Sequence, residues 1–318
     1  MKSSLQFLFA IIFLFVSNAQ EPIQRDSITE LDEVILLDSL QSATDNGIIA
    51  TKIIGPKVFQ NYSPVDMVSA INQISGVYIL SGALNTNRIT IRGVGARTLF
   101  GTDKLRLYYN DIPITNGSGF STIESFDLEN LSSVEVIKGP KATNYGANLG
   151  GAILLNSKQP TNESTYFRNN FTLGSYNLVK NNLQFSLKEN KIALNLHYGY
   201  LETDGYRENN KFKREGLLLD LNYQINPKTN IGLLFNHVDY NAQIPSSLGE
   251  TDFKENPTKA AFTWKSAKGY EDNKYSLAGL TLNHAFSDKL KNTSSIFYSY
   301  LDHYEPRPFG ILEEYTNG

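Results

Sequence analysis

Few side chains in this sequence have the types and spacing that covalent or metal chemistry requires. The chain has no cysteine, and therefore no disulfide, thiol nucleophile or thiolate metal ligand. Its histidines are far apart in the sequence, and none forms a closely spaced pair of ligands: His197, His237, His284 and His303. No Ser/His/Asp arrangement, paired-carboxylate motif or phosphate-binding loop is recognisable. The sequence therefore points away from an enzyme and toward binding, with no predicted catalytic residue, metal site or cofactor.

One glycine-rich stretch has an ordered spacing. Residues 134–158, "VEVIKGPKATNYGANLGGAILLNSK", place glycines among short apolar runs that favour β-strands. Gly139, Gly146, Gly150 and Gly151 permit tight turns and close backbone approaches that a side chain would prevent. Taken alone, this stretch also fits a turn region of any α/β domain. Its meaning therefore depends on the elements around it.

The N-terminal residues have the pattern of a secretory signal peptide. Lys2 supplies a positive charge, residues 5–16 form an apolar run, and small residues precede a cleavage site after Ala19. The run is shorter than a membrane-spanning helix requires. We therefore expect residues 1–19 to be removed and the mature chain to leave the cytoplasm. An uncleaved membrane anchor is the alternative.

The charge of the chain excludes one class of partner. With 29 basic and 32 acidic residues, the net charge is −3, so the basic excess typical of nucleic-acid-binding proteins is missing. Residues 20–50 begin with an acidic and polar segment, which we expect to be flexible. Within it, "LDEVIL" at residues 31–36 is an isolated β-prone run.

Residues 51–158 have the pattern of a compact α+β module. Ser63, Pro64 and Asp66 predict the start of a helix, and an apolar face then recurs until Gly76 ends it. Short apolar runs separated by turn signals predict strands. These runs are residues 77–80, 88–93, 105–109, 134–139 and 150–156.

From residue 159 onward, apolar and polar residues alternate with the period of a β-strand. About seven such strands are predicted, joined alternately by short turns, such as residues 188–191, and by long loops at residues 202–213 and 241–272. Strands of about ten residues with this loop asymmetry and many aromatic residues are typical of a transmembrane β-barrel. A soluble antiparallel sandwich is the alternative.

Together these parts resemble the TonB-dependent outer-membrane receptors. "ITIRGVGAR" at residues 89–97 is similar to that family's plug motif, the stretch at 134–158 resembles its signature at the end of the plug, and "LDEVIL" resembles a TonB box. The resemblance implies an α+β plug domain at residues 51–158. At residues 159–318 it implies the N-terminal third of an antiparallel transmembrane β-barrel. Because the family's barrel has many more strands, we expect this chain to be the N-terminal part of a receptor.

The resemblance also implies roles for particular residues. The TonB box would comprise Leu31, Asp32, Glu33, Val34, Ile35 and Leu36, which TonB would bind as an added strand. An ordinary first strand of the plug is the alternative for this segment. Arg92, Glu135 and Lys138 would dock the plug against the barrel. The family more commonly has arginine at the position of Lys138, and lysine cannot form the same bidentate contact with a carboxylate.

The implied function is import of a scarce solute across the cell outer membrane, without a cofactor. We expect a ferric siderophore or ferric citrate, with cobalamin or another ligand as the alternative. A passive porin-like barrel would need neither the TonB box nor the plug signature. The predicted partners are TonB, an extracellular iron chelate and outer-membrane lipids. The residues predicted to contact the solute are Arg97, Phe100, Asn116 and Asn148. Arg97 would bind carboxylates of the chelate, although an arginine in a polar loop is often only solvated.

Overall fold

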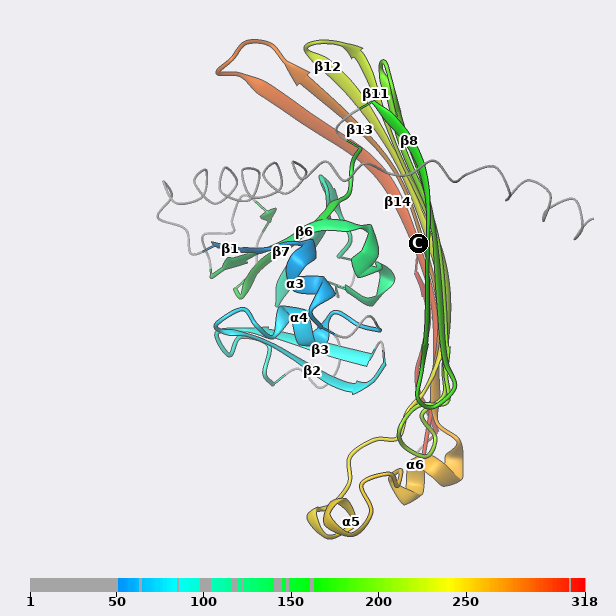
Figure 1. Cartoon of the computed structure of the whole chain (residues 1–318). Helices are drawn as coiled ribbons and strands as arrows, with labels where there is room; N and C mark the ends of the chain where they lie inside the picture. Colours follow the sequence, from blue (N-terminus) through cyan, green and yellow to red (C-terminus); the bar gives the residue numbers. More distant parts are fainter. Residues whose placement is uncertain are drawn as a thin grey trace, which may run out of the picture. The chain divides into compact units, whose positions relative to one another are not determined.

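The structure, a computed structural model, consists of an α+β domain followed by a sheet of long antiparallel strands (Figure 1). It describes residues 51–317, except 63–64, 85, 98–103, 116–118, 120, 122, 140–144, 147–148, 161–162 and 309. The predicted signal peptide and TonB box lie outside these residues. No helix in the described part of the chain has the length and apolar character needed to span a membrane.

The α+β domain is built on a five-stranded sheet with the order β1-β6-β7-β4-β5. Neighbouring strands are antiparallel except β4 and β7, which are parallel. The strands of this sheet are β1 (Thr51–Ile54), β4 (Leu105–Tyr109), β5 (Ile112–Pro113), β6 (Leu131–Lys138) and β7 (Gly151–Ser157). β7 is the most enclosed of them, with Ala152, Ile153 and Leu155 fully buried, as expected for a strand in the middle of a covered sheet.

Two short helices and a hairpin complete the core of the domain. The helices are α3 (Pro56–Gln60) and α4 (Val68–Ile71), and the hairpin consists of β2 (Val77–Ala83) and β3 (Thr86–Ile91). Ile71, Ile79 and Ile91 are among the fully buried side chains that join these elements.

The helix α4 is shorter than the sequence predicts. The predicted starting residues Ser63 and Pro64 lie outside the described residues, and the helix begins only at Val68. Asp66 accepts a hydrogen bond from the Val68 backbone N–H at 3.0 Å, which satisfies a donor that has no partner within the helix. The carboxylate therefore marks the helix start three residues later than the apolar pattern indicated.

Glycine is required where β7 begins. Gly151 has φ +134°, and a Cβ there would lie 2.0 Å from the Ile137 carbonyl oxygen. Gly139, at the end of β6, has φ +93°, and its N–H donates to the Gly150 carbonyl at 2.9 Å. The glycine-rich stretch of the sequence thus closes the β6–β7 pair. A side chain at Gly151 would collide with the neighbouring backbone, and one at Gly139 would be strained by the positive φ.

Eight long strands follow in a single antiparallel sheet in which each strand pairs with its sequence neighbour. We refer to this as the long-strand sheet. Its strands are β8 (Ser164–Gly174), β9 (Leu178–Glu189), β10 (Ile192–Thr203), β11 (Phe212–Asn226), β12 (Thr229–Gln243), β13 (Tyr270–Ala285), β14 (Lys291–Arg307) and β15 (Gly310–Asn317). The sequence predicted about seven, and the strand it missed is β15. Pro306 lies within β14 and Pro308 follows that strand, although proline usually ends strand pairing.

Along β8 to β10, the two faces of the long-strand sheet have opposite chemistry. On β9 the buried side chains are Lys180, Asn182, Gln184 and Ser186. On β8 and β10 the exposed side chains include Phe167, Phe171, Leu173, Leu196 and Tyr198. A soluble sandwich buries its apolar face, whereas an apolar outside and a polar inside are typical of a transmembrane barrel sheet. This inversion argues against the soluble alternative.

Loop lengths differ between the two ends of the sheet. One end has only short connections, at residues 190–191, 227–228 and 286–290. The other end carries the connection at residues 204–211 and the longer one at 244–269, which contains the helices α5 (Glu250–Glu255) and α6 (Phe262–Ala267). The predicted asymmetry of turns and loops is therefore present.

Candidate functional site

A short segment of the α+β domain contacts three adjacent strands of the long-strand sheet. It contains the 3₁₀ turns η1 (Ile123–Ser125) and η2 (Leu128–Asn130), which place successive polar side chains on one surface. We call this set of contacts the seam. Its members are Asp127, Glu129 and Asn130 of the domain, and Lys180 on β9, His197 on β10 and Arg214 on β11.

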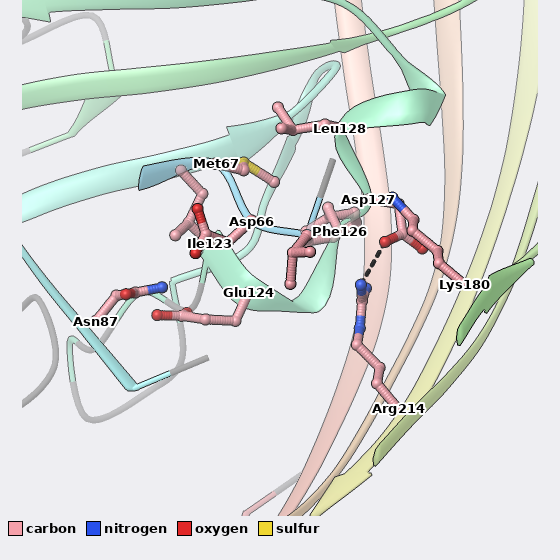
Figure 2. Close-up of a pocket in the computed structure, with 11 residues that line it drawn as sticks. Asp66, Met67, Asn87, Ile123, Glu124, Phe126, Asp127, Leu128, Lys180 and Arg214 are labelled. Atoms are coloured by element: carbon pink, nitrogen blue, oxygen red, sulfur yellow. Dashed lines mark hydrogen bonds and ion pairs between the residues drawn. The ribbon is translucent and has the colours of Figure 1, made fainter. Parts of the chain in front are cut away.

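Each of the three domain residues in the seam has a different partner. Asp127 accepts a hydrogen bond from Arg214 and forms an ion pair with it (Figure 2). The Glu129 Oε1 atom lies 3.0 Å from Lys180 Nζ, and the Asn130 amide nitrogen lies 3.1 Å from His197 Nδ1. The two ion pairs and the neutral hydrogen bond hold one surface against the other and fix their mutual orientation.

The charges of the seam favour an ionised Asp127. Burial alone would raise the pKa of this carboxyl, but Arg214, together with His197 and Lys180, lowers the pKa to about 2. An enclosed carboxylate needs such partners because removing a charge from water is costly.

Two glycines of the long-strand sheet give Asp127 room. A Cβ on Gly199 would lie 2.8 Å from Asp127 Oδ2, and one on Gly216 would lie 3.9 Å from it. At Gly199 a side chain would therefore push the carboxylate out of its position. Close approach of the α+β domain to β10 depends on this glycine.

A small cavity adjoins the seam and is lined by both parts of the chain (Figure 2). Asp66, Asn87 and Glu124 lie on the domain side, and Lys180 and Arg214 lie on the long-strand sheet. Burial, with a further contribution from the Glu271 carboxylate, raises the pKa of Glu124 to about 8. Glu124 is therefore a neutral acid at pH 7, beside an ionised Asp127.

Further contacts extend the seam on both sides. Asn110 donates a hydrogen bond to Asp220 on β11 at 3.3 Å, and Asn236 on β12 donates to the Ser125 carbonyl at 3.0 Å. The aromatic ring of Phe126 stacks on Tyr109 with a centroid distance of 4.5 Å. The same ring meets Tyr275 of β13 edge-on at 6.4 Å. Apolar packing thus accompanies the polar contacts, and β9 to β13 all take part.

The residues predicted to contact a solute are only partly described. Arg97 is exposed in the turn that follows β3. Phe100, Asn116 and Asn148 lie outside the described residues. Among the described residues, no three His, Asp or Glu side chains are grouped so that they could hold a metal ion.

Arg92 and Lys138, two of the predicted docking residues, lie together within the α+β domain. The backbone N–H of Arg92 donates to the Gly76 carbonyl at 2.6 Å. The Nζ atom of the Lys138 side chain donates to the Ser75 carbonyl at 2.7 Å. Burial lowers the pKa of Lys138, and the nearby Arg92 lowers it further.

Glu135, the third predicted docking residue, lies on β6 between β1 and β7. It faces Ile53 and Leu154 in the register of the sheet, and burial raises its pKa. The contacts that the structure gives for all three docking residues are with the domain itself. Their role against the barrel stays a prediction.

Residues 45–153 match the family model described as the TonB-dependent Receptor Plug Domain. This part of the chain is a plug domain of that family. The predicted fold class, an α+β plug followed by part of an antiparallel transmembrane β-barrel, is confirmed. The α+β domain is thus the plug, and the seam is a contact between the plug and the long-strand sheet.

Solved structures show the same fold over most of the chain. The ferric citrate transporter FecA in its unliganded form has a TM-score of 0.70 at 17% identity, covering 85% of this chain and 42% of that one. The ferric yersiniabactin uptake receptor FyuA from Yersinia pestis has a TM-score of 0.70 at 16% identity, covering 82% and 42%. The copper transporter OprC has a TM-score of 0.61 at 19% identity, covering 80% and 38%. This chain therefore spans about 40% of the length of these proteins.

Sequence reasoning missed the seam. Its plug residues lie in "FDLEN", residues 126–130, which has no motif beyond two acidic side chains in a turn. Its partners on the long-strand sheet are 51 to 87 positions away in the sequence, so no local pattern joins them. The available signal was on the strands, where basic and amide residues such as Lys180 and Arg214 occupy the face opposite the apolar one.

Proposed function

We propose that the full-length protein that contains this chain is an outer-membrane receptor that imports a scarce solute with energy supplied through TonB. The observation that carries this proposal is the seam. A plug domain is tied by enclosed ion pairs to a sheet whose plug side carries buried polar side chains on β9 and β10 and apolar ones, such as Leu218 and Leu277, on β11 and β13. The other side of the sheet is apolar. Such an arrangement blocks a barrel and must be rearranged before a solute can pass, so transport requires work on the plug.

The proposed solute is a ferric siderophore or ferric citrate, and cobalamin or another ligand is the alternative. Solved structures of the same fold include a ferric citrate transporter, a ferric yersiniabactin receptor and a copper transporter, so fold similarity alone leaves the cargo open. Arg97 supports an anionic chelate because a guanidinium group suits carboxylate ligands. We propose that Phe100, Asn116 and Asn148 complete the plug's contribution to that site.

The remaining predicted residues have roles in coupling and in retention of the plug. We propose that TonB binds residues 31–36 as an added β-strand, which pairs main-chain groups. Arg92, Glu135 and Lys138 would then dock the plug against barrel strands. The proposed location is the cell outer membrane, and the proposed partners are TonB, the chelate and lipid.

Deletion of residues 31–37 in the full-length receptor tests this function. Uptake of radiolabelled ferric citrate or ferric siderophores should stop, while binding of the same complex to outer membranes should persist. A passive porin-like barrel would give unchanged uptake, and that result would reject energy coupling. If no ferric complex binds or is imported by the wild-type receptor, the same assay with cobalamin and copper chelates separates the alternatives.

A further inference from the structure

Three consecutive residues of the loop between β10 and β11 hold the long loop between β12 and β13. We infer that Arg207, Glu208 and Asn209 are positioning residues that keep residues 244–269 in one conformation before any solute arrives. We call these three residues the clip. The inference rests on the proposed function, because it makes the 244–269 loop a fixed part of the solute-recognition surface and not a lid that closes afterwards.

Asn209 joins the two ends of the long loop. Its side-chain amide donates to the Ile244 carbonyl at 2.8 Å and to the Gly269 carbonyl at 2.9 Å. The Ile244 N–H also donates to the Gly269 carbonyl at 3.0 Å. Asn209 itself has φ +49°, a conformation that asparagine tolerates better than most residues. Both ends of the loop are therefore pinned by one side chain on a neighbouring loop.

Arg207 holds the interior of the loop through main-chain oxygens. Its Nε and Nη2 atoms donate to the Lys259 carbonyl at 3.0 and 2.8 Å, and its Nη1 atom donates to the Ser246 carbonyl at 2.6 Å. Ser246 has φ +57°, which is uncommon for a residue other than glycine and costs energy unless the surroundings hold it. The planar fork of arginine, with several donors, suits this task better than a lysine ammonium.

Glu208 adds contacts between those of its two neighbours. Its N–H donates to the Thr258 carbonyl at 2.8 Å, and its Oε2 accepts from the Ala260 N–H at 3.3 Å. Its Oε1 lies 2.8 Å from Lys265 Nζ on α6, a pair that is exposed and so contributes little to stability. The clip as a whole thus reaches both ends of the loop, its middle and one of its helices.

A loop held in this way presents its surface without a further ordering cost. Phe253 and Phe262 are exposed on α5 and α6, with 62% and 83% of their surface accessible. Ordering a flexible loop when a ligand binds reduces affinity, whereas a loop that is ordered in advance avoids that penalty. The clip should therefore affect solute affinity more than the rate of translocation.

Hydrogen–deuterium exchange on the full-length receptor tests the clip directly. Arg207→Ala should raise amide exchange in residues 244–269 by about tenfold or more, because the loop then opens locally. Asn209→Gly should do the same at the two ends of the loop, since glycine keeps the positive φ and removes only the side-chain donors. Lys211→Ala is the matched control, because the Lys211 side chain pairs with exposed Asp204 of its own loop at 3.1 Å.

Uptake kinetics test the consequence for recognition. With ferric citrate or ferric siderophores as probes, both clip variants should raise KM by about tenfold while the maximal rate per receptor stays at the wild-type value. Uptake rates are divided by the amount of folded receptor in the outer membrane, which is measured by heat-dependent migration in gels. This corrects for any lower yield of the Arg207→Ala variant. Asn209→Gly gives a second test if Arg207→Ala does not fold.

The outcomes separate this inference from the proposed function. The clip would be overturned if amide exchange in residues 244–269 were unchanged in both variants. It would also be overturned if exchange in this loop were already complete at the first time point in the wild-type receptor. Faster exchange with an unchanged KM would overturn its role in recognition. A wild-type receptor that imports none of the ferric probes would reject the proposed cargo, and the exchange comparison would still test the clip.

Discussion

Arg214 on β11 and Asp127 in the plug form an ion pair with only 9% and 13% of their side chains exposed. Losing one partner of such a pair costs far more than losing one partner of an exposed pair, because the charge that remains is poorly solvated. The seam should therefore contribute measurably to the free energy of plug opening.

Replacing Arg214 by alanine should loosen the plug. Removing one partner of an enclosed pair commonly costs about 3–5 kcal/mol, since the other charge is left without compensation. The free energy of plug opening, from native-state hydrogen exchange, should fall accordingly, and permeability to large antibiotics should rise. Lys213→Ala is the matched control on the same strand, because Lys213 pairs with Glu215 in an exposed position. Equal effects of the two substitutions would contradict a special role for the seam.

Glu124 should make the stability of the plug depend on pH. Burial raises its pKa from 4.5 to about 8, so the folded protein keeps a proton that the unfolded chain loses. The free energy of unfolding should therefore fall as pH rises from about 4.5 to about 8. Glu124→Gln keeps a neutral side chain of similar shape, and it should flatten this dependence.

Asp127 should give a pH dependence of the free energy of unfolding opposite to that of Glu124. Its pKa is lowered from 3.8 to about 2, so its contribution to stability is present above pH 3.8 and is lost as pH falls toward 2. Exchange of plug amides, corrected for the intrinsic effect of pH, distinguishes the two carboxyls. A Glu124→Gln plug that loosens at high pH as wild type does would show that another group is responsible.

Proline at position 34 should uncouple binding from transport. Proline lacks the N–H that strand addition requires, so Val34→Pro should abolish energised uptake and leave solute affinity unchanged. Val34→Thr keeps the N–H and the β-branched shape, and should transport. Undiminished uptake by the proline variant would remove residues 31–36 from the coupling step.

Arg97 should contribute to solute affinity if the cargo carries carboxylates. Loss of a hydrogen bond to a charged group costs roughly 1.5–3 kcal/mol, so Arg97→Ala should raise Kd for the ferric complex by about tenfold or more. Arg97→Lys keeps the charge without the fork and should give an intermediate Kd. Identical Kd values for all three proteins, measured by calorimetry on purified full-length receptor, would exclude Arg97 from the site.

Local sequence pattern predicted the parts of the fold that depend on local rules. The tight backbone at Gly139 and Gly151 was predictable because glycine is the residue that adopts such conformations readily. Alternation along β9 and β10 identified strands, and the inverted chemistry of their two faces became clear only when the register was known. The strand β15 was missed because Pro306 lies within β14 beside a register shift, so the signal that usually ends a strand stands inside one.

The candidate site was less predictable because it depends on distant partners. Asp127 is one acidic residue in a turn until Arg214 and Gly199 are placed beside it. Arg207 is likewise one basic residue in a polar loop, and the two acceptors of its three hydrogen bonds are main-chain oxygens that no side-chain pattern reveals. Residue type limits what such side chains can do, and only tertiary structure selects among the possibilities.

The strand order of the plug has a consequence for the sequence of folding events. In the long-strand sheet every strand pairs with its neighbour in the chain, so that sheet can grow hairpin by hairpin. In the plug, β7 lies between β6 and β4, and β1 pairs only with β6, about 80 positions later. The plug sheet therefore cannot close until Ser157 has emerged, one short connection before the first long strand. Plug folding is therefore completed by its last strand, which directly precedes the first strand of the barrel sheet.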